Sequence, residues 1–167
     1  MHRIHKSLTV LAAVALLFAG CSQPKATMPL FDAARDGNVE QVAANIRAGA
    51  DVSARGATNR TVLMIAIVGA NKEVIDMIMA KKPDVKAIDD RGWTALHLAA
   101  ANNMPDLAEE LLRRGADINA RNSDKTSPYH MALLYRNNQV ALMLKAKGCD
   151  LKTYALNAEP RTSGAGG

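Results

Sequence analysis

Short apolar runs recur along the central part of the chain, and polar turns rich in Gly, Asn and Asp separate them. The recurrence has a period of 33 residues, carried by an alanine and by an aspartate in each unit. The alanines are Ala33, Ala66, Ala99 and Ala132, and the aspartates are Asp51, Asp84, Asp117 and Asp150. Two residue types in phase over four units predict a repeat protein in which neighbouring units bury each other's apolar faces.

Local signals place two helices in each unit. Thr61 and Thr94 precede apolar runs, where their hydroxyls can accept a backbone N–H and begin a helix. Glycines that suit the left-handed end of the second helix follow in three units: Gly49, Gly115 and Gly148. In the second unit Lys82-Pro83 replaces Gly-Ala, so we expect a differently shaped helix end there.

The third unit carries a recognisable motif. It reads Asp89-Asp90-Arg91-Gly92, then Trp93-Thr94-Ala95-Leu96-His97-Leu98-Ala99-Ala100, and later Leu111-Leu112-Arg113-Arg114-Gly115-Ala116-Asp117. This resembles the ankyrin repeat. The resemblance implies an all-α solenoid of about four helix–turn–helix units with short hairpin-like fingers. The expected repeat domain is 28–152, divided near 28–57, 58–89, 90–122 and 123–152, and a disordered tail is expected at 153–167.

The start of the chain predicts export. A basic beginning precedes an apolar stretch at 8–18, which is too short to span a bilayer as a mature helix. Its end, Leu17-Phe18-Ala19-Gly20-Cys21, resembles a bacterial lipobox. The resemblance implies a lipoprotein signal peptide at 1–20, an acylated Cys21 and a tether at 21–27. The alternative is a simple cleaved signal with an incidental cysteine.

These features imply a location. The lipobox resemblance places the protein in the cell envelope of a Gram-negative bacterium, anchored in the membrane by lipid and facing the periplasm. Ser22, which follows Cys21, resembles the sorting pattern for the outer membrane. We therefore expect a membrane contact through the lipid anchor alone.

Charge and motif content argue against several function classes. The net charge of +5 includes Arg3 and Lys6 of the expected signal peptide, and no run of Lys or Arg forms a stripe, so nucleic acid is not an expected partner. A Gly-rich phosphate loop, a nucleophile elbow and zinc-ligand spacing are all lacking. We expect no enzymatic activity, no cofactor, no metal and no small-molecule substrate.

Two histidines, His97 and His130, occupy the same place in adjacent units. The ankyrin resemblance implies that they are structural and bond to the backbone of the neighbouring loop. A zinc shared between them is an awkward alternative, because adjacent helices lie about 8–10 Å apart and Zn–N bonds are only about 2 Å long. The aspartate row is expected to bond its own turns rather than to form a carboxylate site.

The remaining candidate for a functional site is a protein-binding surface. The resemblance implies that partner proteins bind the fingers and the adjoining first-helix positions. In this chain these positions are Arg35, Asp36, Arg60, Val68, Asp90, Arg91, Trp93, Asn102, Asp124 and Tyr135. Trp, Tyr and Arg dominate binding hot spots, so Trp93 flanked by Arg60 is the expected anchor, although packing on the neighbouring finger explains Trp93 equally well.

Two roles fit a protein-binding surface in the periplasm. One is an adaptor or scaffold for a periplasmic protein, including enzymes of oxidative-stress defence. The other is an immunity protein that neutralises a toxic secreted effector. The sequence does not identify the partner protein.

Overall fold

The computed structural model describes residues 29–151. The predicted signal peptide at 1–20, the lipidated Cys21 with its tether at 21–27, and the tail at 153–167 lie outside this range. The helices are α2 (Leu30–Arg35), α3 (Val39–Arg47), α4 (Val62–Gly69), α5 (Lys72–Ala80), α6 (Ala95–Ala101), α7 (Pro105–Arg113), α8 (Pro128–Leu134) and α9 (Asn138–Ala146).

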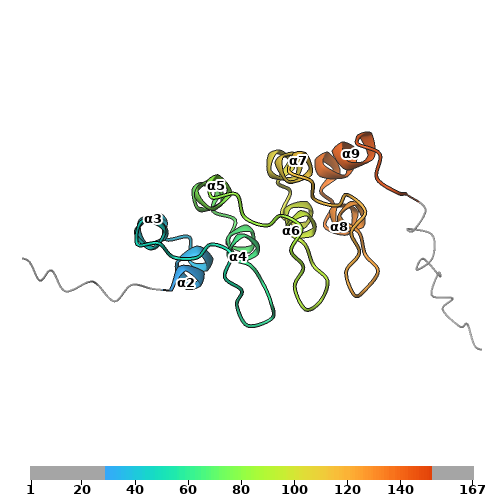
Figure 1. Cartoon of the computed structure of the whole chain (residues 1–167). Coiled ribbons are helices and arrows are strands. Elements are labelled where there is room, and N and C mark those ends of the chain that lie inside the picture. Colours follow the sequence, from blue (N-terminus) through green and yellow to red (C-terminus); the bar gives the residue numbers. More distant parts are fainter. Residues whose placement is uncertain (1–28, 152–167) are drawn as a thin grey trace, which may run out of the picture.

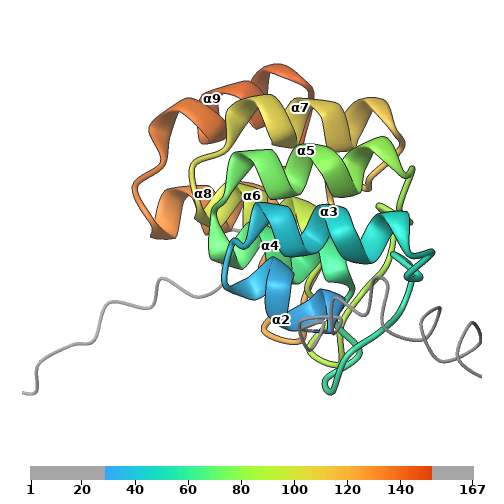
Figure 2. The same ribbon diagram turned by 90° about the vertical axis from the view of Figure 1, so that its left-hand side faces the viewer.

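The helices form four pairs stacked side by side (Figure 1). The first helices of the pairs make an inner layer of α2, α4, α6 and α8, and the second helices make an outer layer of α3, α5, α7 and α9 (Figure 2). Long fingers precede α4, α6 and α8 and project from the inner layer. Within 29–151 there is no strand, and the all-α solenoid predicted from the sequence is confirmed.

Small residues allow the inner helices to approach closely. The four periodic alanines are fully buried, and large apolar side chains such as Leu63, Leu96 and Leu111 fill the space between the layers. Helix α4 is apolar on every side because α2 and α6 cover it from both directions. Gly69 ends α4 where a Cβ atom would lie 2.8 Å from the carbonyl oxygen of Arg35, so only glycine permits this contact.

Three of the inner helices, α4, α6 and α8, begin at hydroxyl side chains. Thr61 accepts a hydrogen bond from the Met64 N–H, and Thr94 accepts one from the His97 N–H. Ser127 does the same for α8. These bonds satisfy N–H groups that have no partner inside the helix, and they set where each finger ends.

The predicted change of shape at the end of α5 is wrong. Lys82 has φ +54°, the same left-handed turn as Gly49, Gly115 and Gly148. In the other pairs the next residue donates its N–H to a carbonyl near the end of the helix, as Ala116 does to the Leu111 carbonyl at 2.9 Å. Pro83 has no N–H and cannot make this bond, so the turn keeps its shape with one hydrogen bond fewer.

Asparagine side chains tie neighbouring pairs together between the inner and outer helices. Asn71 donates to the Gly37 carbonyl at 3.2 Å, and Asn137 donates to the Ala100 carbonyl at 2.8 Å. The same position of the third pair holds Met104, which cannot donate. The junction between the second and third pairs therefore lacks this tie.

No helix within 29–151 has the length and apolar character needed to cross a membrane.

Candidate partner-binding surface

Two of the fingers are closed by a side chain that accepts backbone N–H groups. In the finger before α6, Asp89 Oδ1 accepts from Arg91 at 2.9 Å and from Trp93 at 2.8 Å. In the finger before α8, Asn122 Oδ1 makes the equivalent bonds. Both residues are buried, so these bonds form away from water and hold the finger turns in one conformation.

Arg60 is engaged within the structure. Its guanidinium Nε lies 3.1 Å from Asp89 Oδ2, and the Asp89 side chain is only 2 % exposed. This ion pair joins the finger before α4 to the finger before α6. Backbone bonds link the fingers further, from Asp90 N to Thr58 O and from Ser123 N to Arg91 O. The fingers thus form one connected row.

Trp93 is a packing residue rather than an exposed finger tip. Its side chain is partly buried against the core, and its ring centroid lies 5.9 Å from that of His97. Of the two interpretations of Trp93, the structure shows packing, and Arg60 makes a structural ion pair. Their contacts come from Asp89 and His97, which the repeat alignment did not connect with them.

His97 has a structural role. Its Nδ1 accepts the Thr94 N–H at 3.2 Å, so Nε2 carries the proton and donates to the Thr126 carbonyl at 2.9 Å. His97 is fully buried, and burial lowers its pKa. The neutral ring thus links the start of α6 to the next finger, as the ankyrin resemblance implied. His130 holds Ser127 through Nδ1 at 2.8 Å, and burial lowers its pKa too.

The periodic aspartates serve the turns. Asp51, Asp84 and Asp117 each accept the N–H of the residue two positions on, at 2.8–2.9 Å. The prediction of a turn role is confirmed for these three. No group of three or more His, Cys, Asp or Glu side chains in the described part of the chain is arranged to hold a metal ion.

The predicted binding residues fall into two sets on the inner layer. Arg60, Asp90, Arg91, Trp93 and Asp124 belong to the fingers, which meet the inner helices at their N-terminal ends. The second set lies where these helices end: Arg35, Asp36, Val68, Asn102 and Tyr135. An inner helix of seven residues separates the sets by about 10 Å. The two sets share one layer but do not form one cluster.

The second set, which we call the helix-end row, differs in its contacts and exposure from one helix pair to the next. At the first pair Arg35 is bound to Asp32 at 2.9 Å and to Asp36 at 3.0 Å. Asn102 donates to the Leu98 carbonyl at 3.0 Å and so serves the end of α6. Val68 and Tyr135 are 48 % and 55 % exposed and are thus available to a partner.

Two further large exposed residues lie on these surfaces, and of these Ile88 was missed as a candidate. Leu134, beside Tyr135, is 71 % exposed and extends the apolar part of the helix-end row. Ile88, in the finger before α6, is 54 % exposed and stands where the neighbouring fingers have Arg55 and Arg121. The 33-residue register could have found Ile88, because an apolar residue in a row of arginines at a surface position is unusual.

The stacked helix pairs, the fingers and the His97 link are the geometry of a known repeat. A family model described as "Ankyrin repeats (3 copies)" matches residues 30–122, which is more than half of the chain. The chain belongs to the ankyrin repeat family. The match covers three of the helix pairs, and α8 with α9 lies beyond it.

Individual relatives match over part of their length. Protein phosphatase 1 regulatory subunit 27 of Mus musculus is 33 % identical over 98 residues, which are 58 % of this chain and 64 % of that protein. RelA-associated inhibitor of Mus musculus is 35 % identical over 89 residues, 53 % of this chain and 11 % of that protein. The chain thus spans less than two thirds of either relative's length. A regulatory subunit and an inhibitor point to a protein–protein interaction module.

Proposed function

We propose that this ankyrin protein is a non-enzymatic adaptor or scaffold that is tethered by lipid in the bacterial periplasm and binds a periplasmic protein. An enzyme of oxidative-stress defence is one such partner. The proposal also counts α8 with α9 as a fourth ankyrin repeat, since Ser127 and His130 repeat the arrangement of Thr94 and His97.

The observation that carries the binding role is the exposed apolar row on the inner layer. Val68, Leu134 and Tyr135 are 48 %, 71 % and 55 % exposed at the ends of α4 and α8. The buried interior is already filled by other side chains, so the fold does not need these residues. A tyrosine with adjacent aliphatic groups suits the desolvated centre of an interface, and the charged fingers suit its rim.

The test of the surface begins with a pulldown from envelope extract, followed by titration calorimetry with the captured protein. Val68→Ser combined with Tyr135→Ala should weaken binding by about 2 kcal/mol while circular dichroism stays helical. Leu142→Ser on α9, 67 % exposed and on the outer layer, is the matched control and should bind as the parent does. Equal binding by all three proteins would contradict the proposed surface.

The identity of the captured protein separates two roles. An envelope protein made by the same cell supports the adaptor. A secreted toxic effector supports the alternative, an immunity protein that neutralises it. The same surface serves both roles, because each needs only a protein-binding face.

The tether is tested separately. Cells that make the parent chain or Cys21→Ser are labelled with a fatty-acid analogue, and the membrane fraction is collected. The parent should carry the label and sediment with membranes, and Cys21→Ser should do neither. Equal labelling of both would contradict the lipid anchor, and the binding surface would remain to be judged on calorimetry alone.

A further inference from the structure

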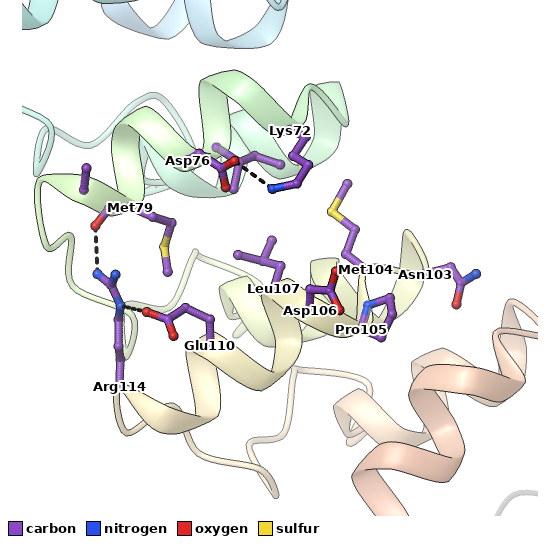
Figure 3. A pocket seen from close by; sticks show the side chains of 12 residues that line it. Lys72, Asp76, Met79, Asn103, Met104, Pro105, Asp106, Leu107, Glu110 and Arg114 are labelled. Atoms are coloured by element: carbon purple, nitrogen blue, oxygen red, sulfur yellow. Dashed lines mark hydrogen bonds and ion pairs between the residues drawn. The ribbon is translucent and has the colours of Figure 1, made fainter.

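The outer layer holds a groove on the side away from the fingers. Helix α3 packs against α5, and α7 packs against α9, but α5 and α7 stand further apart. A groove of about 580 Å³ lies between them (Figure 3). Its apolar lining is Ile75, Met79, Met104 and Leu107.

The missing asparagine tie coincides with this opening. Asn71 and Asn137 bind carbonyl groups of the preceding pair, and Met104 occupies the same position at this junction. The Met104 side chain lines the groove instead (Figure 3). The groove is therefore a property of this one junction and not of the repeat itself.

The groove has an apolar floor that a partner can use. Ile75 and Met79 are buried at its base, and Met104 and Leu107 are partly buried on the α7 side. Methionine is flexible and polarisable, so two methionines can adjust to the side chains of a partner.

The two ends of the groove differ in charge. At the N-terminal ends of α5 and α7, Lys72 pairs with Asp76 at 2.7 Å, and Asp106 leaves a net negative charge. At the C-terminal ends Glu110 binds both Arg113 and Arg114. A second hollow of about 450 Å³ continues from the groove through Ala80 and Arg114, and Lys82 and Arg113 line it. This end is therefore positive.

Arg114 makes the positive end rigid. Its Nη1 donates to the Met79 carbonyl at 2.7 Å, and its Nε bonds Glu110 at 2.6 Å (Figure 3). The guanidinium therefore spans from α7 to the end of α5. Arg113 beside it is held by Glu110 at 2.6 Å, so an incoming acidic group meets a cation that is already in place, which lowers the ordering cost of binding.

We propose that this groove binds an amphipathic helix of a partner protein, lying parallel to α5 and α7. Its apolar stripe would contact Met104 and Leu107, and an acidic residue in its last turn would meet Lys82 and Arg113. The positive N-terminal end of the bound helix then faces Asp76 and Asp106. A groove between two parallel helices accepts a third helix through anchors spaced i, i+3 or i+4, and i+7.

Two designed peptides of about 16 residues test the orientation, since as helices they are about 24 Å long and reach beyond both ends of α5, which spans about 14 Å. Both carry the same leucine stripe. One has lysines in its first turn and glutamates in its last turn, and the other has these charges exchanged. Fluorescence anisotropy with the full chain should give binding of the first peptide and about tenfold weaker binding of the second.

Protein variants test the place. Leu107→Glu should weaken the first peptide about tenfold, and Leu142→Glu, on α9 outside the groove, should leave its affinity unchanged. If Leu107→Glu lowers the helical signal, the variant Lys82→Glu with Arg113→Glu tests the place of binding instead, because both residues are exposed and their replacement does not disturb the core. This double variant should reverse the preference and favour the second peptide.

The proposal is overturned if neither peptide binds, if both bind equally, or if the double charge reversal leaves the preference unchanged. Weakening by Leu142→Glu as large as that by Leu107→Glu would also overturn it. The groove lies on the outer layer and shares no residue with the Val68–Tyr135 surface. Failure of this test therefore leaves the proposed adaptor function standing. Failure of the Val68 and Tyr135 variants would likewise leave the proposed groove standing.

Discussion

The second and third repeats have the same helix pair with the same left-handed end, but they reach it by different means. In the third, Thr94 and His97 cap each other, Asp89 closes the finger, and Gly115-Ala116 completes the helix end. In the second, Met64 replaces the histidine, Gly56 replaces the finger carboxylate, and Lys82-Pro83 ends the helix. At these three places the third repeat is held by polar links that the second repeat lacks.

The second repeat gains stability from apolar burial and from its neighbour. Val62, Leu63, Met64 and Ile67 are all buried in α4, which is sandwiched between two helices. Gly56 leaves room for the Phe31 ring, which lies 3.1 Å from where a Cβ atom would be. Polar links that the repeat lacks are partly supplied from the third, through Asp89 to Arg60 and Arg114 to Met79. A repeat with weak local signals thus persists because the next one supports it.

The largest expected effect is at Asp89. Asp89→Ala leaves the N–H groups of Arg91 and Trp93 without their acceptor and Arg60 without its partner, so it should lower the free energy of unfolding by about 3 kcal/mol. Urea denaturation measures this. Asp89→Asn keeps the acceptor, as Asn122 does in the next finger, and should cost only about 1 kcal/mol. Equal losses would mean that the ion pair, and not the turn, matters.

The histidine links of the third repeat and of the α8–α9 pair should also make stability depend on pH. Burial lowers the pKa values of His97 and His130 below 6.5, so the unfolded chain takes up protons first as the pH falls. The free energy of unfolding should be greatest above pH 6.5 and should decrease as the pH drops below it. Urea midpoints between about pH 5 and pH 7.5 measure this.

A double variant is the control for this pH dependence. His97→Gln with His130→Gln should be less stable than the parent but should show a flatter pH profile over the same range, because neither position titrates. Glu110, whose pKa is lowered from 4.5 to about 2 by Arg113 and Arg114, loses its contribution to stability mainly below pH 4.5, outside this range. An unchanged slope in the double variant would contradict the assignment.

Exchanging the helix ends of the two repeats sharpens the comparison. Lys82→Gly with Pro83→Ala should raise the free energy of unfolding by about 1 kcal/mol, because Gly accepts φ +54° and the alanine that replaces Pro83 brings an N–H for the Ile78 carbonyl. Loss of the proline's rigidity reduces this gain. The reciprocal change Gly115→Lys, at φ +90°, should cost about as much. An unchanged urea midpoint in both would show that these turns carry no strain.

The smallest effect is expected at the Lys72–Asp76 pair on α5. Both side chains are exposed, at 81 % and 62 %, so water and salt screen the 2.7 Å contact. Lys72→Ala should leave the urea midpoint essentially unchanged. A larger loss in urea denaturation would mean that the second repeat also relies on local ion pairs. That result would contradict its stabilisation by apolar burial and by the third repeat.

Much of the fold could be predicted from the sequence. The 33-residue spacing of alanines and aspartates locates every helix pair within 29–151, since stacked units repeat their contacts at that period. The left-handed turn at Lys82 could not be foreseen from the local sequence. It persists because the packing of Val85 and Ala87 on the far side of the turn requires the chain to reverse there.

The candidate surface was harder to predict than the fold. Trp93 and Arg60 looked available because their types favour interfaces and the alignment placed them on fingers. Asp89 was only a motif position without a stated partner, and His97 was expected to bond the backbone of the neighbouring loop rather than to contact Trp93. A periodic alignment compares equivalent positions, and it does not reveal contacts that run diagonally between adjacent repeats, such as Arg60 to Asp89.

The junction that lacks an asparagine is fastened along one side only. Finger bonds and Arg114 hold the second and third repeats together, while the edge at Met104 is open. We expect this junction to bend more easily than the junctions that Asn71 and Asn137 tie. Closing the groove between α5 and α7 would change the curvature of the stack. It would therefore change the distance between Val68 and Tyr135, which lie on either side of this junction. The spacing of the exposed apolar residues Val68 and Tyr135 would then depend on the geometry of this one junction.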